Sequence, residues 1–345
     1  MKKNLLDWYD KNKRDLPWRI KSKKKQLDPF RILVSEIMLQ QTTVGVVQDR
    51  YVAFFRKWPN LKEFSKARES QILRFWSGLG YYRRAINLLK CAKIIKKKYN
   101  YKVPNDDKNL LSLPGIGTYT CSAIQGIAFN KPVIAIDTNV ERVVARVYGL
   151  SGPKSKIKKD IYSYAKNFIH KKRPGDMIQS LMDFGSIICK PKSPLCGKCC
   201  IRSQCLAYKL KLTDKIPFND KKIINKPIKY ASCYIITNIQ NNKILLKKRK
   251  PSGLLPSMLE VPSSEWLKEP LTKKQIDYYR PIKKNYKRIK GSIIYSFSHF
   301  DLKIRIFFTH TNEKSIDNFR WYSIKNIHLL ELPTIMKKIL KEYIK

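Results

Sequence analysis

The N-terminal part of the chain, residues 1–210, places its apolar residues at the spacing of α-helices. The segment "FRILVSEIMLQQT" shows the i, i+3, i+4, i+7 pattern at Phe30, Leu33, Val34 and Ile37. The same spacing recurs in residues 61–76, 84–98, 118–129, 138–149, 156–169 and 176–188. Short turns such as "GLG" and "RPGD" separate these segments. We therefore predict an all-α domain over residues 1–210.

The pattern changes after residue 210. Residues 211–228 are polar and basic and contain two prolines, which is typical of a linker. Runs rich in β-branched and aromatic residues follow, as expected of strands: "YASCYIIT", "KILLKKR", "SIIYSFS" and "LKIRIFFT". The helical pattern of "LPTIMKKILKEYI" closes the chain. The predicted organisation is a helical domain, a linker and a smaller α/β domain over residues 229–345.

The charge of the chain points to an anionic partner. There are 72 lysines and arginines against 26 aspartates and glutamates, a formal net charge of +46, which favours a nucleic acid or an acidic membrane surface. Lysine, isoleucine and asparagine are abundant throughout, so compositional drift is an alternative source of part of the excess. The hydrophobic content of 43% is that of a folded, globular protein.

The apolar residues do not form a membrane signal. No apolar run reaches the roughly 18 residues of a transmembrane helix, and Asp7 interrupts the apolar start of the chain. We therefore expect no membrane span and no signal peptide. The expected protein is a cytoplasmic monomer, associated with the nucleoid if its source is a bacterium.

Five of the eight cysteines lie in one short stretch, "CKPKSPLCGKCCIRSQC", at residues 189–205. In a reducing compartment, clustered cysteines are more often metal ligands than disulfides. The other three, Cys91, Cys121 and Cys233, lie in apolar segments and are interpreted as core residues. The stretch therefore predicts a metal site, with a four-thiolate zinc ion and an iron–sulfur cluster as the alternatives.

Two glycines mark a junction between helices. Gly115 and Gly117 lie in "LSLPGIGTYTCSAI", after a helix that ends near Leu113 and before one that begins near Thr118. Glycines at such a junction let backbone N–H groups converge at a helix N-terminus, where they bind anions. The alternative is a tight turn without a ligand. The basic surroundings favour a helix-hairpin-helix that holds a DNA phosphate.

Two carboxylates stand out by their surroundings. Glu36 has apolar neighbours on both sides in "ILVSEIMLQ", and it is either a boundary residue facing water or a buried acid with a raised pKa. Asp137 begins a helix in "IDTNVERV", and it is either a simple N-cap or the partner of Glu36. Such a pair suits cleavage of a glycosidic bond. One acid protonates the leaving group and one carboxylate faces the oxocarbenium-like centre.

Five motifs occur in one order along the chain: "SEIMLQQT", "GLGYYRRA", "LPGIGTYT", "IDTNV" and the cysteine stretch, Cys-x6-Cys-x2-Cys-x5-Cys. Together they resemble the helix-hairpin-helix DNA glycosylases with an iron–sulfur cluster, most closely the adenine DNA glycosylases. The resemblance covers nearly the whole chain. It implies a monofunctional enzyme of base excision repair that removes adenine mispaired with 8-oxoguanine or guanine in double-stranded DNA.

The resemblance also implies a role for each motif residue. The ligands of one [4Fe–4S] cluster would be Cys189, Cys196, Cys199 and Cys205, with Cys200 as a spare. The catalytic residues would be Glu36 as general acid, Asp137 as stabiliser of the sugar cation, and Tyr119 and Asn139 as their supports. The adenine pocket would hold Trp18, Arg19 and Gln179. DNA contacts would come from the stacking wedges Gln41 and Tyr81 and from the hairpin residues Leu113, Gly115 and Gly117.

The C-terminal domain resembles the Nudix-like domain of the adenine DNA glycosylases. The motif "PSGLLPSMLEVP" opens it, and "YSFSHFDL" follows later. Phe297, Ser298 and His299 in the second motif would read 8-oxoguanine, and the alternative is an ordinary hairpin turn. No Nudix hydrolase box follows "LEVP", so we do not expect pyrophosphohydrolysis.

Two related enzymes and one inactive relative are the alternatives. Enzymes of the endonuclease III type remove oxidised pyrimidines and carry a nucleophilic lysine where this chain has Tyr119. Thymine glycosylases can share the tyrosine, but they typically end soon after the cysteines. A catalytically silent DNA-binding relative is the third alternative, and the presence of Glu36 and Asp137 argues against it.

Overall fold

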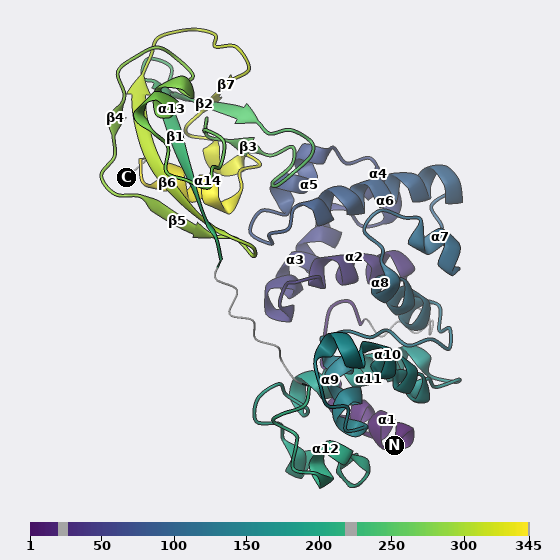
Figure 1. Cartoon of the computed structure of the whole chain (residues 1–345). Helices are drawn as coiled ribbons and strands as arrows, with labels where there is room; N and C mark the ends of the chain where they lie inside the picture. The colour runs from purple at the N-terminus through teal and green to yellow at the C-terminus, as the bar shows by residue number, and fades with distance from the viewer. Residues whose placement is uncertain (20–26, 218–225, 344–345) are drawn as a thin grey trace. The chain divides into compact units, whose positions relative to one another are not determined.

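The computed structural model describes residues 1–19, 27–217 and 226–343 (Figure 1). The chain divides into two compact units. The first contains Met1–Lys66 and Asn87–Lys222, and the second contains Ala67–Ile86 and Ile223–Lys345. Residues 218–225 of the predicted linker lie outside the described residues.

The first unit is helical, as predicted. Its α-helices are α1 (Lys2–Asn12), α2 (Pro29–Leu39), α3 (Val44–Lys57), α4 (Leu61–Ser65), α7 (Asp107–Leu111), α8 (Thr118–Ala123), α9 (Thr138–Val147), α10 (Lys154–Ala165), α11 (Pro174–Ile187) and α12 (Leu206–Lys209). Helix α6 (Arg83–Tyr99) begins in the second unit and ends in the first. A π-helix, Ile124–Ala128, continues α8 directly.

One segment that the apolar spacing predicted as a single helix forms two helices. Residues 61–76 form α4 and α5 (Glu69–Phe75), so the prediction of a single helix was wrong. Asn60 caps α4 by accepting a hydrogen bond from the Glu63 N–H. A new start follows at Arg68, whose backbone N–H donates to the Gln71 side chain at 2.8 Å. Capping groups stop and restart the helix although the apolar spacing runs through.

Helices α9 and α11 pack against each other at the centre of the first unit. Valines along one face of α9 are buried with Met177, Leu181 and Phe184 of α11. The approach is close at Gly185, where a Cβ atom would lie 2.7 Å from the Cβ of Asn139. A larger residue there would force the two helices apart, so this glycine fixes the position of Asn139 at the start of α9.

The second unit contains a mixed β-sheet. Its strands are β1 (Ile228–Asn238), β2 (Lys243–Lys248), β3 (Leu259–Glu260), β4 (Lys287–Arg288), β5 (Ile293–Ser296), β6 (Asp301–His310) and β7 (Arg320–Ser323). The sheet order is β3-β2-β1-β6-β4, with β5 also paired to β6 and β7 to β2. The central pair, β1 and β6, is parallel, with Ile228 opposite Asp301 and Thr237 opposite His310.

Helices cover both faces of this sheet (Figure 1). Alternate β1 residues point to opposite faces: Cys233 and Ile235 pack with α14 (Thr334–Lys341), whereas Tyr234 and Ile236 pack with the α13 (Lys273–Tyr278) side. Burial on both faces explains why "YASCYIIT" is apolar without alternation. The predicted small α/β domain is confirmed.

The motif "YSFSHFDL" spans the end of β5 and the start of β6. These strands pair antiparallel, with Ser296 opposite Asp301. Residues 297–300 form the turn, which closes with a hydrogen bond from the Phe297 N–H to the Phe300 carbonyl at 2.9 Å. In the part of the chain that the structure describes, no helix is long and apolar enough to span a bilayer.

Candidate active site

A cleft of about 730 Å³ opens in the first unit between α2, α8, the start of α9 and α11. It brings together most of the residues that the sequence predicted for the chemistry: Trp18, Arg19, Glu36, Gln41, Tyr119, Asp137, Asn139 and Gln179. Leu113, Gly115 and Gly117 lie in the same unit but do not line the cleft. Tyr81 and Phe297, Ser298 and His299 belong to the second unit.

Glu36 is buried in the wall of the cleft. It lies on α2 and is only 5% exposed, so the interpretation as a solvent-facing boundary residue is excluded. Burial raises the pKa of its carboxyl to about 7; the Tyr119 hydroxyl hydrogen bond lowers this pKa, nearby Asp137 raises it and Arg19 lowers it. Because the carboxyl is about half protonated at neutral pH, Glu36 can act as a proton donor there.

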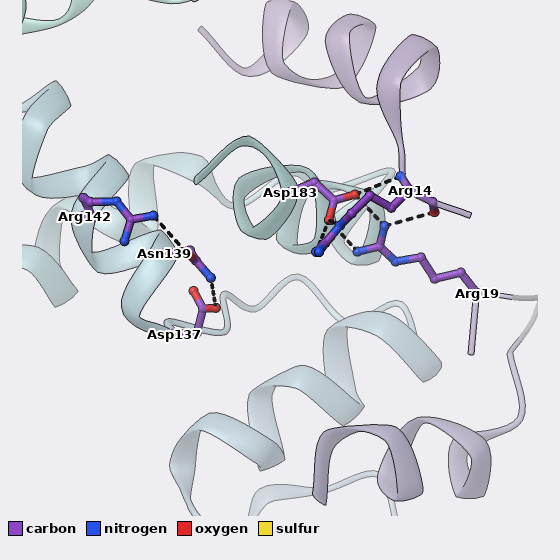
Figure 2. Close-up of polar contacts among 6 residues, drawn as sticks. All are labelled: Arg14, Arg19, Asp137, Asn139, Arg142 and Asp183. Carbon is purple, nitrogen blue, oxygen red and sulfur yellow. Dashed lines mark hydrogen bonds and ion pairs between the residues drawn. The ribbon is translucent and has the colours of Figure 1, made fainter. Parts of the chain in front are cut away.

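Asp137 is both a helix cap and a cleft residue (Figure 2). Its Oδ1 accepts a hydrogen bond from the Val140 N–H at 2.7 Å, and its Oδ2 accepts one from Asn139 Nδ2 at 2.8 Å. The prediction of an N-cap is confirmed, and the role of Asp137 as partner of Glu36 stays a prediction. The cap fixes the carboxylate at the start of α9, on the edge of the cleft.

A hydrogen-bonded chain supports Asn139 from behind. Arg142 Nη2 donates to Asn139 Oδ1 at 2.9 Å and to the Gly185 carbonyl at 2.6 Å (Figure 2). Arg142 Nε donates to the Cys189 carbonyl at 2.7 Å. The sequence analysis missed Arg142. Its signal was present in "ERVVARV", because a buried arginine among valines is as unusual as a buried glutamate.

The three residues that the sequence predicted for an adenine pocket line the cleft, and each contacts a further residue. Trp18 is buried and meets the Tyr51 ring edge-on, at 5.5 Å between ring centroids, so it packs the core and lines the cleft. Gln179 on α11 donates from Nε2 to the Gly175 carbonyl at 3.2 Å. Arg19 forms an ion pair with Asp183, another residue that the sequence analysis missed.

Four of the clustered cysteines surround a separate cavity of about 20 Å³. These are Cys189, Cys196, Cys199 and Cys205. Arg146 Nη1 donates to Cys189 Sγ at 3.4 Å, and Cys205 Sγ donates to the Arg146 carbonyl at 3.3 Å. Cys200 does not line the cavity. Within the described residues, no three His, Cys, Asp or Glu side chains converge on a single metal ion.

The loop between α7 and α8 has the backbone of a tight hairpin. Gly115 has a φ of +86°, and a Cβ there would lie 3.1 Å from the Cβ of Asn87. Gly117 is the N-cap of α8 in extended conformation. Leu113 is buried, so this residue contributes to the hairpin through its backbone and its core packing.

Gln41 and Tyr81 share an unusual backbone. Both adopt the left-handed region, with φ of 54° and 45°, which side chains other than glycine seldom adopt. Gln41 lines the cleft. Tyr81 is 47% exposed, and its hydroxyl hydrogen-bonds the Ser298 hydroxyl within the second unit.

The turn at residues 297–300 stands on an aromatic cluster. The Phe297 ring lies 4.9 Å from Phe300 and Tyr295 and 5.5 Å from Trp266, measured between centroids. Ser298 and His299 are exposed on the turn. Their side chains are therefore accessible while Phe297 is half-buried beneath them.

Two known families match successive parts of the chain. Residues 34–167 match the HhH-GPD superfamily of base excision DNA repair proteins, and residues 233–342 match the NUDIX domain. The helical part resembles the structure of a thermostable thymine-DNA glycosylase, at 32% identity and a TM-score of 0.54 over 61% of this chain and 95% of that one. A non-covalent endonuclease III–DNA complex shares the fold, at 24% identity and a TM-score of 0.51 over 61% and 94%.

Three relatives that match nearly the whole of this chain are adenine DNA glycosylases. The adenine DNA glycosylase of Buchnera aphidicola subsp. Schizaphis graminum is 32% identical over 98% of this chain and 96% of its own. That of Buchnera aphidicola subsp. Acyrthosiphon pisum is 34% identical over the same shares, and the human adenine DNA glycosylase is 29% identical over 99% of this chain and 73% of its own. The chain is a DNA glycosylase of base excision repair, and it belongs to the adenine DNA glycosylase family.

Proposed function

We propose that this protein hydrolyses the N-glycosidic bond of adenine mispaired with 8-oxoguanine or guanine in double-stranded DNA. The observation that carries the proposal is the pair of carboxylates in one cleft. Glu36 is buried with a pKa raised to about 7, while Asp137 is held by two hydrogen-bond donors. Two carboxyl groups in unlike surroundings can take the separate roles of acid and stabiliser.

The roles follow from the surroundings of each group. Glu36, protonated, donates its proton to the departing adenine, and the Tyr119 hydroxyl keeps the carboxyl oriented. Asp137 stabilises the sugar cation, directly or through a transient covalent bond. Asn139 holds one oxygen of Asp137 and leaves the carboxylate facing the cleft.

The remaining cleft residues hold the flipped adenine. Trp18, Arg19 and Gln179 provide a flat ring, a cation and an amide along one wall. Gln41 and Tyr81 fill the gap that the adenine leaves in the base stack, and their left-handed backbones agree with a functional constraint at both positions. The hairpin at Leu113, Gly115 and Gly117 binds a phosphate of the same strand.

The opposite base is read by the turn of the second unit. 8-Oxoguanine offers an oxygen at C8 and a hydrogen on N7, where guanine offers only the N7 acceptor. Ser298 and His299 are exposed and carry both donors and acceptors. Phe297 fixes the turn from below through its aromatic neighbours.

The enzyme leaves the DNA backbone intact. A lyase of the endonuclease III type needs an amine nucleophile. In the described part of the chain the cleft has Tyr119 in its wall and is lined by no lysine. This supports a monofunctional glycosylase over the alternative that removes oxidised pyrimidines and cuts the strand.

We propose one [4Fe–4S] cluster on Cys189, Cys196, Cys199 and Cys205. The four thiols line one cavity and Cys200 does not. Four thiolates are the ligand set of such a cluster, and a four-thiolate zinc site is the alternative. Burial raises the pKa of Cys199 to about 12, so its proton must leave when the metal binds. The cluster supplies a covalent staple for the loop, and Arg146 is placed to donate a hydrogen bond to one sulfur.

Iron content tests the cluster. Anaerobically purified protein should contain about four irons per chain. Cys199→Ser should lose iron, and the matched Cys200→Ser should keep it because Cys200 does not line the cavity. Stoichiometric zinc without iron, in protein made with ample iron, would contradict the cluster.

We further propose a division of labour along the chain. Residues 1–210 form the glycosylase domain with the cysteine loop at 189–205, residues 211–228 form the linker, and residues 229–345 form the lesion-recognition domain. The protein acts as a monomer on chromosomal DNA, in the cytoplasm.

Excision assays decide the function. Duplexes would contain adenine opposite 8-oxoguanine or guanine, thymine opposite guanine, or thymine glycol. We expect excision of adenine alone, with strand breaks appearing only after alkali, and a loss of about 10²- to 10⁴-fold in the excision rate of Glu36→Gln. Excision of a pyrimidine, or breakage without alkali that borohydride traps, would favour the endonuclease III type of activity.

A further inference from the structure

Two arginines and one aspartate form a charged cluster in the wall of the cleft (Figure 2). Asp183, on α11, is fully buried. Arg14 and Arg19 lie in the segment that follows α1, and both line the cleft. Each makes an ion pair of 2.5 Å with Asp183. With two arginines and one aspartate, the cluster has a net charge of +1.

The Asp183 carboxylate receives several donors at once. Arg19 binds it in bidentate fashion, from Nη1 to Oδ2 at 2.5 Å and from Nη2 to Oδ1 at 3.0 Å. Arg14 adds its Nε to Oδ1 at 2.7 Å and its backbone N–H to Oδ2 at 3.3 Å. A bidentate pair fixes the plane of a guanidinium as well as its position. The orientation of Arg19 in the cleft is thus set by Asp183.

Arg19 lines the same cleft as the proposed acid, Glu36. Burial raises the pKa of Glu36, and the Arg19 charge is the smallest of the named effects on it, in the lowering direction. The other groups that act on Glu36 are Tyr119 from α8 and Asp137 at the start of α9, and Glu141 of α9 lines the same cleft. Glu36, Asp137 and Glu141 are the carboxyl groups that line the cleft together with Arg19, so they are the candidate partners of this guanidinium once Asp183 is removed.

Such a partner exchange would disable the acid. A carboxylate that pairs with arginine stays ionised and has no proton to give. One Arg19 donor, Nε–H, is buried and has no acceptor among the residues that the structure describes, so the guanidinium retains an unmade hydrogen bond. The cleft therefore holds an arginine whose Nη atoms bind Asp183 and whose Nε has no acceptor among the described residues.

We propose that Asp183 is a positioning residue that keeps Arg19 from pairing with Glu36 and presents this arginine to the flipped adenine as a fixed hydrogen-bond donor. The proposal rests on the proposed function, because it takes Glu36 to be the acid. It assigns to Asp183 no contact with the substrate. Asp183 acts through Arg19 alone.

The pH dependence of single-turnover adenine excision tests this role. In the wild type the rate should fall as pH rises through about 7, where Glu36 loses its proton. In Asp183→Asn the fall should move to lower pH by about one unit or more, since an unpaired arginine beside a carboxyl lowers its pKa. Asp176→Asn is the matched control. Asp176 lies on the same helix and pairs with Arg173 at the surface, and its substitution should leave the midpoint unchanged.

Two further variants separate positioning from damage to the fold. Adding Arg19→Gln to Asp183→Asn should return the midpoint to the wild-type value or above it, because the displaced charge is gone. If Asp183→Asn acted by misfolding the cleft, adding Arg19→Gln would not restore the midpoint. Arg14→Gln should raise the midpoint slightly, since it removes a positive charge and leaves Asp183 to Arg19. If Asp183→Asn does not fold, Arg14→Gln tests the proposal instead. A midpoint of Arg14→Gln below that of the wild type would contradict the proposal.

The possible failures can be told apart. A wild-type protein that excises no adenine from either mispair would overturn the proposed function. An active wild type, with a midpoint that stays in place in folded Asp183→Asn, would overturn the role of Asp183 and leave the function standing.

Discussion

The carboxylate cleft and the β5–β6 turn are built on opposite principles. In the cleft, Glu36 is buried, Asp137 is held at both oxygens, and Asn139 is locked by Arg142. In the turn, Ser298 and His299 are exposed above a cluster of aromatic rings, and the Ser298 hydroxyl hydrogen-bonds the Tyr81 hydroxyl. Proton transfer benefits from a group that water does not reach, because desolvation sets its pKa. Recognition of a base requires side chains that are accessible to DNA. The discrimination that they provide is therefore limited to what exposed hydrogen bonds can contribute.

The comparison predicts effects of very different size, and the largest is on catalysis. Glu36→Gln keeps the shape of the side chain but cannot donate an acidic proton. Excision of adenine should fall by about 10²- to 10⁴-fold, the usual contribution of a general acid. Binding of the same duplex should change little, because phosphate contacts carry most of the affinity. Single-turnover rates and a binding titration at fixed salt measure the two quantities.

Asp137→Asn should produce a loss of similar order by a different route. The amide still accepts the N-cap hydrogen bond from Val140, yet it has no charge to stabilise the sugar cation. Either variant with near wild-type rates would show that the two carboxyl groups are not the chemical centre, and the contrast between cleft and turn would then lose its basis.

The second effect is on stability, and it depends on pH. The folded-state pKa of Glu36, about 7, lies above its ordinary value of 4.5. The folded protein therefore binds the proton more tightly than the unfolded chain, and stability falls as pH rises from about 4.5 to about 7. Glu36→Gln has no titrating carboxyl at this position and therefore does not lose this stability as the pH rises. Above pH 7 it should be more stable than the wild type by up to about 3 kcal/mol, at 1.36 kcal/mol for each pH unit.

Urea unfolding at pH 5 and pH 8 measures this difference. The gain should be small at the lower pH and near its maximum at the higher one. Glu63→Gln is the matched control, since Glu63 is exposed and paired with Lys66 across one helical turn, and its change should stay within about 0.5 kcal/mol. An equal gain for Glu36→Gln at both values of pH would mean that its carboxyl is not titrating as described.

Local sequence patterns predicted much of this architecture. Apolar spacing located most helices, and runs such as "YASCYIIT" located the central strand, because side chains on one face of an element recur at a fixed interval. The anomaly of Glu36 was equally local, since its neighbours in the helix are apolar. Where the burial of a residue depends on its neighbours along the chain, the sequence was sufficient to predict it.

Features that depend on distant partners were not predicted. Asp183 looks like an ordinary polar position in "LMDFGS", and its partner Arg19 lies 164 positions earlier. Nor does spacing show that residues 67–86 group with the second unit. The π-helix at Ile124–Ala128 was expected as plain α-helix, because the apolar pattern of "CSAIQGIAF" does not distinguish a hydrogen-bond shift of one residue.

The third effect concerns the turn. Ser298→Ala with His299→Ala should reduce the preference for adenine opposite 8-oxoguanine over adenine opposite guanine by about ten- to a hundredfold, the value of one or two lost hydrogen bonds of roughly 1–3 kcal/mol. Excision opposite guanine should change little. The measurement is the ratio of single-turnover efficiencies at low enzyme concentration. Ser292→Ala, an exposed serine just before β5, should leave the ratio unchanged, and an unchanged ratio in the double variant would remove the turn from lesion reading.

The smallest effect is on the stability of the second unit. Because Ser298 and His299 are exposed and the only side-chain hydrogen bond lost among the described residues is that between Ser298 and Tyr81, their double replacement should alter the free energy of unfolding by no more than about 1 kcal/mol. Phe297→Ala should cost over about 1 kcal/mol, since it removes ring contacts with Trp266, Phe300 and Tyr295 that are each worth roughly 0.5–1.5 kcal/mol. Thermal or urea unfolding distinguishes the two. If the double variant were as damaging as Phe297→Ala, the polar residues would be part of the fold of the turn, and a loss of selectivity in the same variant could no longer be attributed to a missing contact with the base.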